Sequence, residues 1–212
     1  PGVAAERCYM PRADAETILR QQHIPLCSLE SARPLREFHV VGFSVQHELC
    51  YTNLLAILDL AGIPLAGADR RGQALPLIVA GGNVYNPAPL EPFIDAFALG
   101  DGEDTIRRLA DWALQNIAHT GALTPDTALL RDLARSVPGI YVPALYPLSD
   151  AGPRRHRLPP AAPDLPFPVR KQVVQDLATT PFARAPIVPF CEAVHDRAQI
   201  EIMRGCVRGC RF

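Results

Sequence analysis

The stretch that decides the fold is Phe38-His39-Val40-Val41-Gly42-Phe43-Ser44. It is apolar on both faces, which is typical of a strand inside a parallel sheet that helices cover on either side. A helix is predicted directly after it, from about Leu49 to Leu60, with a broad apolar stripe and Gly62 at its carboxyl cap. Together they predict the beginning of a βαβ unit.

The same alternation continues downstream. Buried strands are predicted over residues 75–80 and 95–99, and an amphipathic helix over residues 104–117. Strands that alternate with helices predict right-handed crossovers and an α/β fold with an open, Rossmann-like parallel sheet. The strand exits at Ser44, Gly81-Gly82 and Gly100-Asp101-Gly102-Glu103 should then lie along one carboxyl edge, where doubly wound sheets bind ligands.

The segments on either side are less regular. Before the first strand, Cys8-Tyr9 suggests a short strand, and Asp14 caps a predicted helix that ends near Gln22, with Ile18 and Leu19 facing inward. After a helix over residues 124–135, nine prolines occur between Pro138 and Pro168. This density predicts a linker with at most edge strands, such as residues 140–142, and a solvated loop at residues 154–157.

Bulk properties exclude several classes of protein. The 212 residues carry a formal net charge of −1, which does not suggest a partner such as nucleic acid or an anionic membrane. No apolar run reaches 18 residues, so no membrane partner is expected. Six unevenly spaced cysteines do not form a disulfide framework, and this favours a reducing, cytoplasmic location.

The chain ends in Arg204-Gly205-Cys206-Val207-Arg208-Gly209-Cys210-Arg211-Phe212. Cys-x3-Cys is too wide for the Cys-x2-Cys spacing of a zinc ribbon or a thioredoxin-like redox pair. Residues 198–203 before it are predicted to form a short strand, and the glycines allow the backbone to approach an inorganic cluster closely. The alternative is a pair of ordinary free thiols.

This ending resembles the opening of Cys-x3-Cys-x2-Cys, the cluster motif of radical S-adenosylmethionine (SAM) enzymes. The third cysteine would fall at position 213, and Phe212 matches the aromatic residue that usually precedes it. The resemblance implies that Cys206 and Cys210 are metal ligands of a [4Fe-4S] cluster, that SAM binds the open iron next to Phe212, and that the preceding strand is the first of a (β/α) barrel.

Further stretches are similar to an uncharacterised bacterial branch of the cobalamin-binding-type radical SAM proteins: Val41-Gly42-Phe43-Ser44-Val45-Gln46, residues 59–65, Ala80-Gly81-Gly82-Asn83 and Gly100-Asp101-Gly102-Glu103. The resemblance implies a cobalamin-binding-like domain over residues 1–120, a helical and Pro-rich linker over 121–195, and the start of the barrel over 196–212. It also implies a longer chain at both ends.

Cofactor contacts are expected at the carboxyl edge of the sheet. Ser44 and the pair Gly81-Gly82 match two signatures of the cobalamin site, whereas Gly100 and Gly102 belong to a Gly-rich loop at a helix start. No histidine stands in an Asp-x-His-x-x-Gly context, so a sheet that serves as scaffold or docking module is the favoured alternative. His47-Glu48 and Cys50-Tyr51 follow the first strand and are further candidates for the cleft.

The predicted function is therefore that of a fragment of a radical SAM enzyme, which reduces and cleaves SAM to generate a 5′-deoxyadenosyl radical. The resemblance implies an electron donor such as flavodoxin or ferredoxin. No motif in the sequence identifies the substrate. With two thiolates and no barrel, the fragment itself is expected to be inactive. The alternative is a stand-alone corrinoid- or nucleotide-binding module.

Overall fold

The computed structural model describes all residues except 1, 83–85, 150–155, 182–199 and 210–212. The chain divides into a first unit, Pro1–Val173, and a second unit, Val174–Phe212. The domain boundaries expected at residues 120 and 195 stay predictions.

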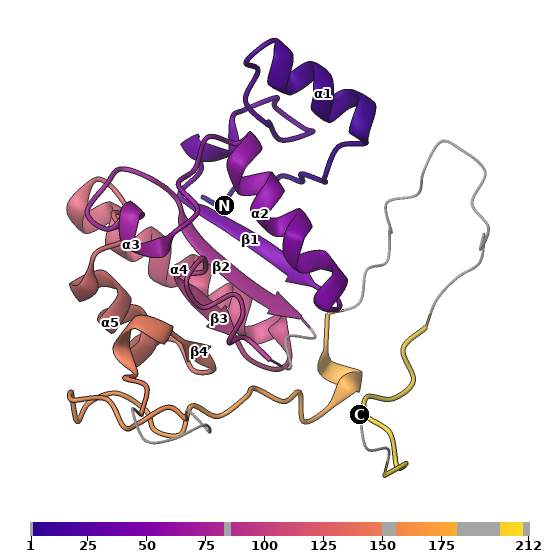
Figure 1. Cartoon of the computed structure of the whole chain (residues 1–212). Helices are drawn as coiled ribbons and strands as arrows, with labels where there is room; N and C mark the ends of the chain where they lie inside the picture. Colours follow the sequence, from indigo (N-terminus) through magenta and orange to yellow (C-terminus); the bar gives the residue numbers. More distant parts are fainter. Residues whose placement is uncertain (1, 83–85, 150–155, 182–199, 210–212) are drawn as a thin grey trace. The chain divides into compact units, whose positions relative to one another are not determined.

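The first unit is built on a four-stranded sheet in the order β1-β2-β3-β4 (Figure 1). Its strands are β1 (Val40–Val45), β2 (Leu77–Gly82), β3 (Ala96–Ala98) and β4 (Ile140–Tyr141). The pairs β1–β2 and β2–β3 are parallel, which confirms the predicted α/β fold with an open, mostly parallel sheet. β4 pairs antiparallel with β3, so the sheet is not parallel throughout. This antiparallel edge strand was predicted as residues 140–142.

Helices cover both faces of the sheet. The helices of the first unit are α1 (Ala13–Gln21), α2 (Tyr51–Leu60), the short α3 (Gly67–Arg70), α4 (Gly102–Thr120) and α5 (Thr127–Ser136), with 3₁₀ turns at Leu35–Glu37, Glu48–Cys50 and Pro143–Leu145. Leu54 and Leu58 of α2 pack on one face together with Val41 and Ile78. The opposite face holds α4 and α5 through Trp112, Leu130 and their neighbours.

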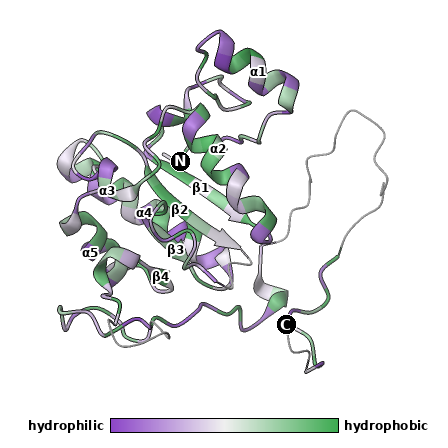
Figure 2. Ribbon diagram, in the orientation of Figure 1, coloured by the Kyte–Doolittle hydropathy of each residue, from purple (hydrophilic) through white to green (hydrophobic). Residues whose placement is uncertain are grey.

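Successive side chains of the strands point to opposite faces of the sheet, and both faces are buried. In β2, Leu77 and Val79 belong to the core beneath α4 and α5, while Ile78 and Ala80 belong to the core beneath α2. All four side chains are at most 5% exposed, as a strand between two helical layers requires. Figure 2 shows the hydrophobic residues of β1 and α2 that build the α2 side of this arrangement.

The amino-terminal helix differs from its prediction. Leu19 packs against the core as expected, but Ile18 is 56% exposed. Residue Arg12 rather than Asp14 occupies the N-cap position of α1, and the Asp14 carboxylate accepts a hydrogen bond from the amide of Ala15. No residue of the helix is buried, so it lies on the core through partly exposed side chains such as Leu19.

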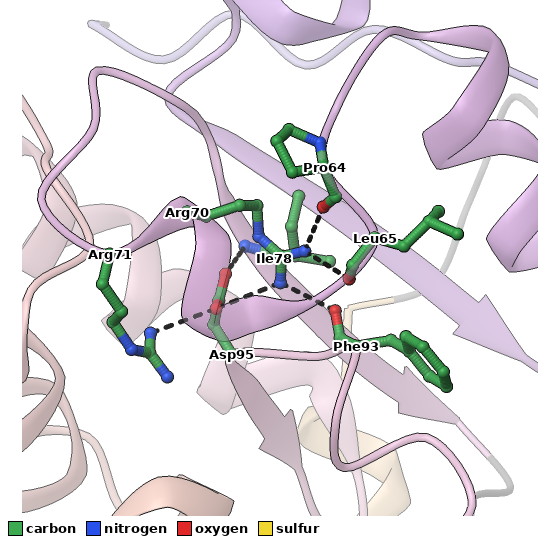
Figure 3. A network of polar contacts seen from close by, with 7 residues as sticks. All are labelled: Pro64, Leu65, Arg70, Arg71, Ile78, Phe93 and Asp95. Atoms are coloured by element: carbon green, nitrogen blue, oxygen red, sulfur yellow. Dashed lines mark hydrogen bonds and ion pairs between the residues drawn. The ribbon is translucent and has the colours of Figure 1, made fainter.

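A buried ion pair joins the amino ends of β2 and β3 (Figure 3). Arg70 Nη2 lies 3.1 Å from Asp95 Oδ1, and both side chains are fully buried. Arg70 also donates to the carbonyl oxygens of Pro64, Leu65 and Phe93 at 2.6–2.7 Å. The second carboxylate oxygen of Asp95 accepts the amide of Ile78 at 2.8 Å. The network therefore ties the loop around α3 to two strands of the sheet.

The Pro-rich region up to Val173 belongs to the first unit. Arg157, predicted in a solvated loop, instead forms an ion pair with Glu91, and the Glu91 side chain is 13% exposed. Further on, Gln172 forms a bridge with Gly100 at the end of β3. The sequence predicted neither contact. A high density of prolines indicates only local structure, whereas the partners in each contact are more than 60 residues apart in the chain.

The second unit contains one 3₁₀ turn, Leu177–Thr179, in its described part. Residues 200–203 show no strand pairing, so the described part of the expected barrel strand is not confirmed; residues 198 and 199 lie outside the described residues. Ile200 and Ile202 are 74% and 85% exposed. A single strand without a partner leaves its main-chain groups unpaired and is not stable alone.

Candidate functional site

Ser44 and Gly81 lie side by side at the carboxyl end of the parallel strands. They are register partners in β1 and β2, and Val45 is the partner of Gly82. Gly100 follows β3, the next strand of the sheet. The structure thus brings together the three strand exits that the sequence placed at one edge. Their role in holding a cofactor stays a prediction.

Gly82 is required by the close approach of β1. Its φ of +96° favours glycine, and a Cβ atom there would stand 2.7 Å from the carbonyl oxygen of Val45. The neighbouring Gly81 is less crowded, since its nearest contact would be the Ala98 Cβ at 3.5 Å. The glycine pair therefore has a structural reason within the sheet itself.

Gly100 is in contact with a later part of the chain. The amide of Gln172 donates to the carbonyl of Leu99 (2.8 Å), and the amide of Asp101 donates to the carbonyl of Gln172 (2.9 Å). A Cβ atom at Gly100 would overlap the Gln172 main chain. The backbone amide that a bound anion would need at this loop is thus paired with Gln172. Gly102, the first residue of α4, has open space around it.

His47 and Cys50 bring an imidazole and a thiol close together at this edge. Cys50 Sγ lies 3.7 Å from His47 Nδ1, in the turn that connects β1 to α2. Beside them, Gln46 Nε2 donates to Ser44 Oγ at 3.2 Å. The described residues contain no group of three or more histidine, cysteine and acidic side chains placed to hold a metal ion. The turn thus places a thiol and an imidazole directly after the carboxyl end of β1.

Two tyrosines hold the loop that follows β2. Tyr51 of α2 donates its hydroxyl hydrogen to the carbonyl of Asn86 at 2.9 Å, and Tyr141 of β4 donates to Glu91 Oε1 at 2.8 Å. Burial and the neighbouring Glu91 carboxylate both raise the pKa of Tyr141, so its phenol stays protonated and donates. The contacts of Glu91 with Tyr141 and Arg157 could not be predicted from the sequence, because no local pattern links these residues.

The cysteine loop belongs to the second unit. Cys206 is exposed, and its Sγ accepts the amide of Arg208 at 3.4 Å. Gly205 before it has a φ of +87°. Arg204 pairs with Glu201 at 2.7 Å, so its positive charge is partly neutralised. An exposed thiol that accepts a main-chain N–H is suited to cluster ligation, because such hydrogen bonds tune cluster thiolates. Cys210 and Phe212 lie outside the described residues.

The remaining cysteines show no such arrangement. Cys8, Cys27 and Cys50 are partly buried and free. Burial and the nearby Cys27 both raise the pKa of the Cys8 thiol, which disfavours the thiolate that a metal requires. Cys191 lies outside the described residues.

Comparison with known proteins identifies the family. The profile of the family described as "Radical SAM proteins, N-terminal" matches residues 1–143. The chain belongs to this family. No match was found among curated proteins or among solved structures. The matched residues hold the whole sheet of the first unit, from α1 through β4. Cys206 lies beyond the match, so its role rests on the loop itself.

Membership of the radical SAM family implies a [4Fe-4S] cluster and SAM as cofactors. It does not extend to cobalamin. No helix in the described part of the chain combines the length and apolar character needed to cross a membrane.

Proposed function

We propose that the chain is the amino-terminal part of a radical SAM enzyme and that Cys206 and Cys210 supply two of the three thiolates for a [4Fe-4S] cluster. When bound, the cluster supplies the electron that cleaves SAM and produces a 5′-deoxyadenosyl radical. The observation that carries the proposal is a radical SAM amino-terminal domain followed in the same chain by Cys-x3-Cys. The electron donor we expect is a flavodoxin or ferredoxin.

Cys206 fits the role of a cluster ligand by exposure and hydrogen bonding. Its thiol is accessible, and the amide of Arg208 would stabilise the thiolate. Glycines on both sides of Cys206-Val207-Arg208 leave the main chain without Cβ atoms where a cluster would approach. Two thiolates do not complete the ligand set, so we expect residues 1–212 alone to be inactive.

The test uses the chain expressed with the coding sequence that follows Phe212. After anaerobic reconstitution with iron and sulfide, we expect the broad visible absorbance of a [4Fe-4S] centre and about four irons per chain. Cys206→Ala and Cys210→Ala should each abolish it, whereas Cys27→Ala should not. Full iron content in either of the first two variants would reject the ligand assignment.

For the first unit we propose a scaffold or docking role rather than corrinoid binding. The glycine at Gly100 faces the chain's own Gln172, and Gly82 is packed against Val45. Both glycines therefore have reasons that need no ligand. The alternative, a corrinoid- or nucleotide-binding module, is favoured by one observation, the adjacent positions of Ser44 and Gly81 at the carboxyl edge.

A further inference from the structure

Gln172 binds the end of β3 through its main chain. It forms a parallel bridge with Gly100, in which its amide donates to the carbonyl of Leu99 at 2.8 Å and its carbonyl accepts the amide of Asp101 at 2.9 Å. A residue from the Pro-rich segment therefore continues the hydrogen bonding of β3 beyond the last residue of that strand.

Two glycines from different loops leave the space that Gln172 fills. A Cβ atom at Gly100 would overlap the Gln172 main chain, and a Cβ atom at Gly139 would stand 2.7 Å from the Gln172 Cγ. Gly139 has a φ of +81°, and its carbonyl accepts the amide of Leu99 at 2.9 Å. One glycine thus makes room for the main chain of Gln172 and the other for its side chain, which indicates a specific contact.

The chain is well anchored to the first unit as far as Pro166. The Leu165 side chain is 7% exposed and belongs to the core beneath α4 and α5. The buried Tyr146 donates its hydroxyl hydrogen to the carbonyl of Pro166 at 2.8 Å. Release of this part would expose apolar core, so it is expected to open only when the first unit unfolds.

Residues 167–173 are much less buried. The ring of Phe167 stacks on Tyr146 with the ring centroids 6.4 Å apart, yet its side chain is 46% exposed. Val169 contacts the core beneath α2 as a partly buried side chain, and Val173 is 53% exposed. Segments that bury little apolar surface open locally at a small free-energy cost. The main-chain contact of Gln172 is therefore the feature that places this stretch at the end of β3.

We propose that residues 167–173 form a releasable latch. In the closed form Gln172 lies between Gly100 and Gly139. In the open form both main-chain hydrogen bonds of Gln172 are broken and the end of β3 is uncovered, while the chain up to Pro166 and the sheet keep their packing. The end of β3 thus alternates between two forms without unfolding of the first unit.

The latch decides where the chain leaves the first unit. The second unit begins at Val174, directly after the latch. In the closed form the segment that carries Cys206 starts from the end of β3, whereas in the open form it starts from Pro166 and has a longer tether. This consequence for the cysteine loop rests on the proposed function, but the latch itself rests on contacts within the first unit.

Amide hydrogen exchange measured by NMR on the 212-residue chain tests the latch without cluster or SAM, so failure of the cluster assignment would not affect the result. The amides of Gln172 and Asp101 should share one protection factor of about 10- to 100-fold over an unpaired amide, because one opening breaks both hydrogen bonds. Low urea should hardly change it, since local opening exposes little surface.

The amides of Leu77 and Ile78 are the controls from the core. Leu77 donates to the carbonyl of His39 and Ile78 to the Asp95 carboxylate, and both side chains are fully buried. Their amides should exchange at least about 100-fold more slowly than those of the latch. Their exchange should also accelerate with urea, because it requires unfolding that exposes much more surface.

Gly139→Ala should hold the latch open. The added Cβ would collide with the Gln172 side chain, so the protection of the Gln172 and Asp101 amides should fall about tenfold or more. A second substitution, Gln172→Ala, removes the Cγ atom of this collision and should raise the protection again. Gly121→Ala is the matched control: Gly121 has a φ of +76° but nothing within 4 Å of an added Cβ, so it adds backbone strain and leaves latch protection unchanged.

Three results would overturn the proposal. Exchange of the Gln172 amide with the rate and urea dependence of Ile78 would make residues 167–173 a fixed part of the fold. Exchange as fast as that of an unpaired amide would mean that Gln172 does not bind the end of β3 in solution. Unchanged protection in Gly139→Ala, or no recovery when Gln172→Ala is added, would show that the space at Gly139 does not control the latch.

Discussion

Arg70 Nη2 and Asp95 Oδ1 are 3.1 Å apart with no solvent exposure of either side chain, at the end of the sheet opposite the candidate cofactor edge (Figure 3). Such a pair contributes little compared with a well-packed apolar pair, but the loss of one partner leaves a buried charge uncompensated. The arginine also holds three carbonyl groups of two loops. The pair therefore fixes how the α3 loop joins the sheet.

Replacement of Arg70 should be severely destabilising. We expect Arg70→Met to lower the free energy of unfolding by about 3–5 kcal/mol, because the Asp95 carboxylate loses its buried cationic partner and three carbonyls lose their donor. Urea denaturation followed by circular dichroism measures this. Arg71→Met is the matched control, since Arg71 Nη1 also contacts Asp95 Oδ1 (3.2 Å) but its side chain is 25% exposed. Similar losses in the two variants would contradict the special role of Arg70.

Gly100 should be intolerant of any side chain. Its φ of +89° costs an L-residue about 1–3 kcal/mol, and the new Cβ would displace the Gln172 main chain. Lys171 is the only lysine of the chain. We therefore expect Gly100→Ala to lower the thermal midpoint and to accelerate cleavage after Lys171 by a lysine-specific protease.

The matched control for that prediction is Gly102→Ala. Gly102 begins α4 and nothing lies within 4 Å of its added Cβ, so the variant should be neutral or slightly more stable. If Gly100→Ala leaves the cleavage rate at Lys171 unchanged, Gln172 is not held at Gly100 in solution.

Stability should depend on the protonation of Asp132. Burial alone would raise the pKa of this carboxyl, but hydrogen bonds from Trp112 and Arg135 outweigh it and lower the pKa. A depressed pKa in the folded state means that the stabilisation is present above the unfolded value of about 3.9 and is lost as the pH falls through the folded value. We therefore expect an acid-side loss of stability that Asp132→Asn reduces.

Trp112 reports this titration directly. It is the only tryptophan, and its Nε1–H donates to Asp132 Oδ2 at 2.7 Å. Its fluorescence should change as the carboxylate is protonated, at a pH below 3.9, the usual midpoint of an aspartate. In Asp132→Asn that step should vanish. A step that persists in the variant would assign the change to another group.

Hydroxocobalamin should bind residues 1–212 weakly or not at all. Ser44 and Gly81 are adjacent. However, the main chain of Val45 already lies against Gly82, and the main chain of Gln172 lies against Gly100. We expect no saturable change in the visible spectrum of the corrinoid during titration with the protein. A saturable shift at micromolar concentration that Ser44→Ala weakens would instead make the sheet a cofactor domain.

The prediction of β1, α2 and α4 from the sequence succeeded because their signals are local. A run that is apolar on both faces indicates a buried strand, and an apolar stripe at helical spacing indicates a helix against a sheet, so the mostly parallel α/β core followed. Boundaries shifted by a few residues, as at α4, which begins at Gly102 rather than residue 104. The Cys-x3-Cys motif is equally local, and it directed the functional proposal.

Only the tertiary structure shows which residues contact the glycines at the carboxyl edge of the sheet and the charged side chains of the first unit. Gly100 looked like part of a cofactor loop, but its partner is Gln172; Arg157 looked solvated, but its partner is Glu91. Likewise, no pattern in the sequence links Arg70 to Asp95, which lie 25 residues apart. Such contacts join segments that only the packed chain brings together, because burial selects a charged or hydrogen-bonding partner by its position in space and not by its distance along the sequence.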